Sequence, residues 1–201
     1  MRRVALLLLF ACAALAAFTN NTRAQQIDAA VGGGSIFAPA GSTATGDHQP
    51  QSLGGAAYAT GSVDYLFFRK KIGVEVEAAV REDTGTYAQN FLNIPFRPMF
   101  FDGNAIWVTP LRKRIALEVE GGGGVLNTRF QTQFCTSSKC YANSTHPMGD
   151  VGGGIKLYAW RRLFIRPEGR FYLINNNTEF SSGHALRYGF SIGYTFRAPR
   201  P

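Results

Sequence analysis

Cysteine is scarce in this chain, with three among 201 residues. Long apolar runs are missing after residue 24. No stretch there has helical periodicity or the roughly 20 apolar residues that a membrane-spanning helix needs. A helical membrane protein is therefore excluded. Charged residues make up 17% of the chain, whereas glycine occurs 23 times and phenylalanine 16 times. This composition suits one β-rich domain and argues against disorder.

Nucleotide-binding motifs are also missing. The glycine-rich segments lack the helix start or the Gly-Lys-Ser/Thr sequence that phosphate cradles require; they are 32–34, 121–124 and 152–154. We expect them inside strands, where the missing side chains leave room for large neighbours. No cofactor is predicted.

The three histidines, His48, His146 and His184, are all expected in loops with serines nearby in the sequence. No histidine and serine are expected to share a strand face in the arrangement of a base and its nucleophile. Separate loops also offer no metal site of recognisable ligand spacing. We therefore assign no catalytic, cofactor-binding or metal-binding residue.

The first 24 residues have the pattern of a secretory signal peptide. Two arginines precede an apolar run over residues 4–18, and cleavage is expected after Ala24. Cys12 could carry lipid in a lipoprotein leader, but Phe10 fits that motif poorly. The mature domain is predicted to span residues 25–201.

Residues 71–81 show the pattern that recurs through the mature chain. One parity holds the aliphatic side chains Ile72, Val74, Val76, Ala78 and Val80. The other parity holds Glu75, Glu77 and Arg81. Such alternation predicts a β-strand with one apolar and one ionic face, because a helix would scatter both kinds of residue around its axis.

Eight stretches alternate in this way, each at least as long as the ~9 to 11 residues of a tilted transmembrane strand. They are 26–38, 56–68, 71–81, 97–110, 114–130, 147–160, 163–174 and 185–197. Their connections alternate too. Short basic turns follow the second, fourth and sixth stretches, and long connections cover 39–55, 82–96, 131–146 and 175–184. This asymmetry is typical of an all-β, eight-stranded antiparallel up-and-down transmembrane barrel.

The acidic residues keep to one face of the predicted strands. Nine of the 13 acids lie there, and none lies on the apolar face: Asp28, Asp64, Glu75, Glu77, Asp102, Glu118, Glu120, Asp150 and Glu168. Five bases share this face. Opposite charges are expected to pair across the lumen in a network of Glu75, Glu77, Arg81, Glu118, Glu120, Lys156, Arg166, Glu168, Arg170 and Arg187.

Parity alone leaves open which face is inside, because a soluble lipocalin-like barrel would turn its apolar face inward. Aromatic residues near strand ends on the apolar face favour a membrane, where they form interfacial girdles. The ionic face mixes charge signs and includes Tyr158, Trp160 and Tyr172, as a packed, hydrogen-bonded lumen would. We therefore predict the ionic face inside.

The last stretch, Tyr188-x-Phe190-x-Ile192-x-Tyr194-x-Phe196, and the segment Arg166-Pro-Glu168 complete an eight-strand layout that resembles the small outer membrane protein β-barrel domain family. Members of that family look like the transmembrane domain of outer membrane protein A. The resemblance covers residues 26–197, although five residues follow the final Phe196. It implies the outer membrane of a Gram-negative bacterium, insertion by the barrel-assembly machinery, and no catalytic residue.

The expected function is non-enzymatic, structural or surface-interacting, by a monomer with a plugged lumen. Outer-membrane lipid and lipopolysaccharide are its expected partners. The basic residues are spread over turns and lumen, so no aromatic-interleaved groove for nucleic acid remains. Two alternatives stay open: a lipid A-modifying enzyme, as some eight-stranded outer-membrane barrels are, and a small-solute channel.

Cys135 and Cys140 are predicted to form a disulfide in the third long connection, because an exported chain with two close cysteines forms a local bridge. Alkylation of unreduced protein from intact cells should modify neither thiol, and modification after reduction should be complete. The bridge should stabilise the barrel only slightly, since its ring is short. Full alkylation before reduction would contradict the prediction.

Overall fold

The computed structural model describes residues 26–38, 53–68, 71–89, 92–132, 140–175 and 183–196. The predicted signal peptide lies outside these residues, as do Cys135 and His48. No helix among the described segments is long and apolar enough to cross a membrane.

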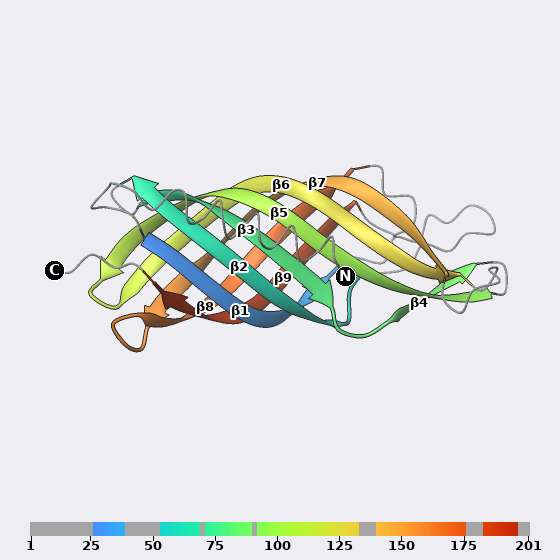
Figure 1. Cartoon of the computed structure of the whole chain (residues 1–201), viewed down its shortest axis with the longest axis horizontal. Coiled ribbons are helices and arrows are strands. Elements are labelled where there is room, and N and C mark those ends of the chain that lie inside the picture. Colours follow the sequence, from blue (N-terminus) through green and yellow to red (C-terminus); the bar gives the residue numbers. More distant parts are fainter. Residues whose placement is uncertain are drawn as a thin grey trace.

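Within the described residues, nine strands form one antiparallel sheet. They are β1 (Gln26–Phe37), β2 (Ala57–Phe68), β3 (Ile72–Arg81), β4 (Gly85–Gln89), β5 (Leu92–Arg112), β6 (Ile115–Thr132), β7 (Cys140–Tyr158), β8 (Leu163–Ile174) and β9 (His184–Thr195). Consecutive strands pair except β3 and β4, β1 pairs with β9, and β3 pairs with β5 from Ile72–Trp107 to Val80–Met99. These pairings close an eight-stranded up-and-down barrel, which confirms the predicted fold (Figure 1).

The small strand β4 is the ninth, and the sequence pattern missed it. It continues the direction of β3 after residues 82–84 and pairs with the beginning of β5. Together β4, β5, β6 and β7 extend beyond the rest of the wall at the end opposite the short turns (Figure 1). We call residues 85–89, 92–99, 127–132 and 140–147 the projecting sheet.

Two predicted strand starts are wrong for the same reason. β5 begins at Leu92 instead of residue 97, and β7 begins at Cys140 instead of residue 147. The added segments read Leu-Asn-Ile-Pro-Phe and Cys-Tyr-Ala-Asn-Ser-Thr-His. The parity that is apolar along the wall holds Asn93 and Pro95 in the first segment and Asn143 and Thr145 in the second, so the pattern of a lipid-facing strand stops there.

Pro98 and Pro167 lie within strands without shifting the strand register. Pro98 pairs with Thr128 without a shift in register. Near Pro167 the pairing of β7 with β8 lapses at Ile155 and Lys156 and resumes in the same register. Register shifts occur at the short-turn end instead. One lies between residues 66 and 68 in the pairing of β2 with β3, and the other lies between residues 110 and 112 in the pairing of β5 with β6.

The apolar face points outward and the ionic face inward. Large apolar side chains exposed on the wall include Val31, Val63, Val76, Phe101, Trp107, Val119, Val151, Ile165, Leu173, Phe190 and Ile192. The carboxylates and most bases of the same strands are buried. This polarity is the reverse of a soluble barrel, and it suits surrounding lipid.

Inward-facing glycines provide the room that large lumenal side chains need. A Cβ atom at Gly154 would lie 2.9 Å from Cγ of Arg166. At Gly193 the same atom would overlap the ring of Phe164, which is fully buried. Glycine is thus required at these two positions by close approach and not by backbone conformation.

Val76→Arg should destabilise the barrel by about 2 to 4 kcal/mol, because Val76 is 66% exposed on the lipid face and pairs with Val63 and Gly103 within the wall. Urea titration of refolded protein in lipid vesicles measures the change, with the faster migration of the unheated barrel on gels reporting the folded fraction. Thr86→Arg is the matched control, since exposed Thr86 lies on the projecting sheet. Equal losses for both variants would contradict this placement.

Candidate functional site

The candidate site is the buried ionic lumen, and its ion pairs join strands that are distant in the barrel. Near the short-turn end, the Lys156 ammonium on β7 lies 2.9 Å from Asp28, 2.8 Å from Asp64 and 2.6 Å from Glu118. These acids come from β1, β2 and β6. All four side chains are at most 2% exposed, so one ammonium joins four strands without water around it.

Arg166 on β8 forms the next group. Its Nη1 lies 2.6 Å from Glu118 and 3.0 Å from Glu75, and its Nε donates to Glu168 at 2.7 Å. Hydroxyls of Ser62 and Ser191 accept further bonds at 3.1 and 3.2 Å. Because a guanidinium has five N–H donors in a fixed plane, it can serve several acceptors at once.

Arg170 lies two inward positions further along β8. Its guanidinium lies 2.6 Å from Glu75, 2.8 Å from Glu120 and 2.5 Å from Asp102, and it approaches Glu77 at 3.3 Å. Glu75 therefore bridges Arg166 and Arg170. The two arginine groups form one continuous network across β3, β5, β6 and β8.

Arg187 on β9 completes the network, with its guanidinium 2.5 Å from Glu77 and 3.3 Å from Glu168. Arg81, which the sequence analysis placed in the same network, pairs with Asp83 at 2.7 Å instead. Asp83 follows the end of β3 and is exposed, and the Arg81 hydrogen bond lowers the pKa of its carboxyl. The structure thus brings nine of the ten predicted residues together.

Acids outnumber bases in this lumen. All nine acids that parity assigned to the ionic face point inward, and only four bases contact them: Lys156, Arg166, Arg170 and Arg187. The fifth base of this face, Arg81, is also buried but pairs with Asp83. Carboxylate oxygens of Asp64, Glu75 and Glu118 lie within 4.8 Å of one another, a spacing that could hold a metal ion. Lys156 and Arg166 already neutralise these carboxylates. The cluster is therefore best explained as an ion-pair network.

Apolar clusters close the lumen on both sides of the network. Towards the projecting sheet, buried Tyr58 meets Phe100 edge to face with ring centroids 5.9 Å apart, and Phe100 packs against Tyr172 with centroids 4.9 Å apart. Towards the short turns, Leu66, Ile106, Val108 and Ala116 form a second cluster against Tyr158. An eight-stranded barrel is just wide enough for side chains to fill it, and here they fill it in three layers.

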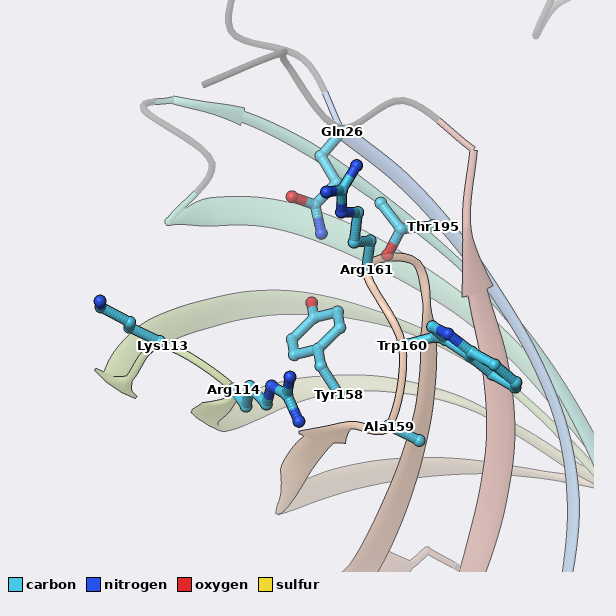
Figure 2. Close-up of a pocket in the computed structure, with 8 residues that line it drawn as sticks. All are labelled: Gln26, Lys113, Arg114, Tyr158, Ala159, Trp160, Arg161 and Thr195. Atoms are coloured by element: carbon cyan, nitrogen blue, oxygen red, sulfur yellow. The ribbon is translucent and has the colours of Figure 1, made fainter.

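A cavity of about 520 Å³ remains at the short-turn mouth (Figure 2). Its lining includes Tyr158 and three bases from two turns, Lys113, Arg114 and Arg161. Tyr158 also packs against the second apolar cluster, that of Leu66, Ile106, Val108 and Ala116, so this cluster bounds the cavity on its inner side. Trp160 was expected in the lumen, but it is 77% exposed and directed away from the other lining residues (Figure 2). It lies in the turn after β7, where strand parity no longer applies.

His146 was expected in a loop, and this expectation is wrong. It lies within β7 rather than in a loop, it is buried, and its Nε2 is 2.9 Å from Oγ of Ser144. The two residues share a strand face because they are two apart in the sequence. The sequence shows this spacing, but a loop was predicted here, so no shared face was expected. His184 begins β9, with its ring 6.0 Å from that of Phe171.

No protein-family model and no curated protein matches this sequence. Solved structures do share its fold. Neisserial surface protein A is 10% identical with a TM-score of 0.56, and the alignment covers 86% of this chain and 97% of that one. Ail, the attachment invasion locus protein of Yersinia pestis in complex with the heparin analogue sucrose octasulfate, is 11% identical with a TM-score of 0.51 and the same coverage. With its apolar exterior, the fold is that of a bacterial outer-membrane barrel.

Arg170→Gln should destabilise the barrel by about 3 to 5 kcal/mol, because it leaves several buried carboxylates without their shared cation. Arg81→Gln is the control and should cost at most about 1 kcal/mol, since its ionic partner is exposed. Denaturant unfolding in lipid vesicles gives both values. A loss for Arg170→Gln no larger than that for Arg81→Gln would show that the network contributes little.

Proposed function

We propose that the protein is a non-enzymatic, non-conducting outer-membrane barrel of a Gram-negative bacterium that acts through its outer surface. The filled lumen is the observation that carries this proposal. Two apolar clusters enclose a network in which every base contacts two or more acids. Such an interior leaves no continuous polar path for solutes.

The projecting sheet is the part that supports a surface role. Short turns are periplasmic in outer-membrane barrels, so the opposite end, where β4 to β7 extend, faces the outside. Its outward face carries polar side chains, including Arg97, Asn127, Arg129, Asn143 and Thr145. Ail, which shares the fold, was solved with a sulfated sugar. We propose lipopolysaccharide and outer-membrane lipid as the partners of this surface.

Two further partner proposals follow from the sequence and the wall. The aromatic alternation of β9 is suited to recognition by the barrel-assembly machinery. A monomer is expected, because apolar side chains are exposed on strands all around the barrel and suit lipid rather than one subunit interface.

The barrel should conduct no ions. In planar bilayers, purified folded protein should give a silent membrane, because side chains fill the lumen beyond the cavity at the short-turn mouth. A variant combining Phe100→Gly and Tyr172→Gly, which opens the outer apolar cluster but keeps the ion pairs, should also remain silent. Reproducible open-channel steps from the unaltered protein would favour the small-solute channel.

The second candidate is a lipid A-modifying enzyme, and the Ser144–His146 hydrogen bond is the observation in its favour. An alcohol next to an imidazole has the arrangement of a nucleophile and its base. Both residues are on the inward face of β7, however, and His146 is buried, so an acyl ester in the membrane would not reach them.

Lipid A incubated with the folded protein should therefore keep all its acyl chains by mass spectrometry. Loss of an acyl chain that Ser144→Ala abolishes would establish the enzyme. Identical loss with Ser144→Ala would indicate a contaminant, because the alcohol that attacks the ester would be absent.

A further inference from the structure

The cavity at the short-turn mouth gathers positive charge. Its volume is about 520 Å³, and three of its lining residues are bases, Lys113, Arg114 and Arg161, whereas no acid lines it among the described residues. All three bases are exposed, and neither arginine forms an ion pair with a described residue. In Figure 2 the two arginines lie on opposite sides of Tyr158, and Lys113 extends away from it. Two guanidinium groups are therefore available at one opening.

The backbone holds both arginines at this opening. The N–H of Tyr158 donates to the Arg114 carbonyl oxygen at 2.9 Å, which fixes the turn between β5 and β6. The N–H of Thr195 donates to the Arg162 carbonyl oxygen at 2.8 Å, which fixes the turn that contains Arg161. Because the backbone is already in place, a ligand has to order only the two side chains.

The floor of the cavity supplies hydroxyl groups. Tyr158 is half-buried and Thr195 is 2% exposed, and both line the cavity. Oγ1 of Thr195 has no hydrogen-bond partner within the described part of the chain. A buried hydroxyl without a partner is unfavourable, because it has lost its contact with water and gained no other bond. An acceptor atom in the cavity would give this hydroxyl the partner that the fold does not.

Two features separate a bound anion from the acids of the lumen. The second apolar cluster packs against Tyr158 and lies on the inner side of the cavity. Asp28, two residues further into the barrel than the lining residue Gln26, accepts hydrogen bonds from Nε2 of Gln26 on both oxygens at 3.0 Å and pairs with Lys156 at 2.9 Å. Its charge is therefore directed to partners within the barrel.

The directions of the donors favour a tetrahedral anion. They come from two turns at the rim and from the ends of β7 and β9 below. A carboxylate presents two oxygens in one plane, whereas a phosphate monoester presents three free oxygens that point in different directions. Each guanidinium can donate two parallel hydrogen bonds to such a group. The cavity is also in the size range of small-molecule sites, ~300 to 1,000 Å³, and leaves space for an organic part beside the phosphate.

We propose that this cavity binds the phosphate group of a small, water-soluble phosphate ester from the periplasm. Arg114 and Arg161 bind phosphate oxygens from the two turns, and the Thr195 hydroxyl donates a further hydrogen bond from below. A soluble ligand is favoured over a lipid headgroup, because Tyr158 and Thr195 line the inside of the mouth, whereas lipid lies outside the wall. The site is at the opposite end from the proposed outer surface and does not depend on it.

Titration of the folded mature protein with glycerol phosphate in a maltoside detergent tests the site, with the backbone amide NMR signals of Tyr158 and Thr195 as the readout. Both signals should shift saturably. Arg114→Gln and Arg161→Gln should each weaken binding about tenfold, the effect of losing one charged hydrogen-bonding partner. Unchanged affinity of either variant would overturn the proposal.

Arg162→Gln is the matched control, because it removes the same charge from the neighbouring position. Nη1 of Arg162 is 3.4 Å from the hydroxyl of exposed Tyr194, and its side chain does not line the cavity. The affinity of this variant for glycerol phosphate should match that of the unaltered protein. A loss as large as that of Arg161→Gln would show that only the overall charge of the rim attracts phosphate, and it would overturn the proposal.

Thr195→Val replaces the hydroxyl by a methyl group of the same shape. Binding of glycerol phosphate should weaken several-fold, because one donor is lost. Without phosphate the denaturant midpoint should stay the same or rise, because the buried hydroxyl without a partner is gone. Unchanged affinity, or a lower midpoint without phosphate, would overturn the assignment of Thr195 as a donor to the ligand.

Two other probes identify the anion and its source. Succinate, a dicarboxylate, should shift the two NMR signals much less than glycerol phosphate does, as should phosphatidylglycerol added to phosphatidylcholine bilayers that contain the protein. Equal binding of succinate would overturn the choice of phosphate, and equal shifts with phosphatidylglycerol would overturn the choice of a soluble ligand. Channel recording and the lipid A incubation do not involve these residues, so failure of this proposal and failure of the proposed function are distinguishable.

Discussion

In the hydrocarbon of a bilayer no water can hydrogen-bond to a backbone N–H or C=O group, so a sheet that crosses it must close on itself. Pairing of β3 with β5 achieves this, and β1 with β9 completes the ring. Closure with eight strands then sets the remaining constraints. The outer face must be apolar, and the polar side chains of every strand are forced into an interior too narrow for bulk water.

The ion-pair network satisfies the second constraint, because it gives the polar side chains of the narrow interior partners of opposite charge. Lys156 contacts acids from three other strands, and Arg170 contacts acids from β3, β5 and β6. Most of these bonds join strands that are not neighbours, so the network ties separate parts of the wall together and favours one strand register over its alternatives. Apolar clusters above and below exclude solvent and strengthen the charge pairs between them. The same side-chain contacts thus fill the lumen and hold the strands of the wall in place.

Beyond the membrane these constraints no longer hold, and the pattern of residues along the strands changes. The outward face of the projecting sheet carries arginine, asparagine and threonine in place of the apolar residues of the wall, whereas Phe96, Thr128 and His146 on its inward face are still buried. The wall therefore carries the stability, and the surface above it is the part that we propose to contact other molecules.

The sequence by itself determined the number of barrel strands, their antiparallel order and the face on which each acid lies, because a two-residue period is a local property. Only the tertiary structure decided which charges meet. Arg81 has the parity of the lumen but pairs with Asp83, and Glu75 bridges two arginines on a distant strand. Such partners depend on the register in which the sheet closes. The early start of β7, and with it the Ser144–His146 pair, was likewise hidden, because polar residues such as Asn143 and Thr145 take the parity that is apolar along the wall and so remove the pattern that reveals a strand.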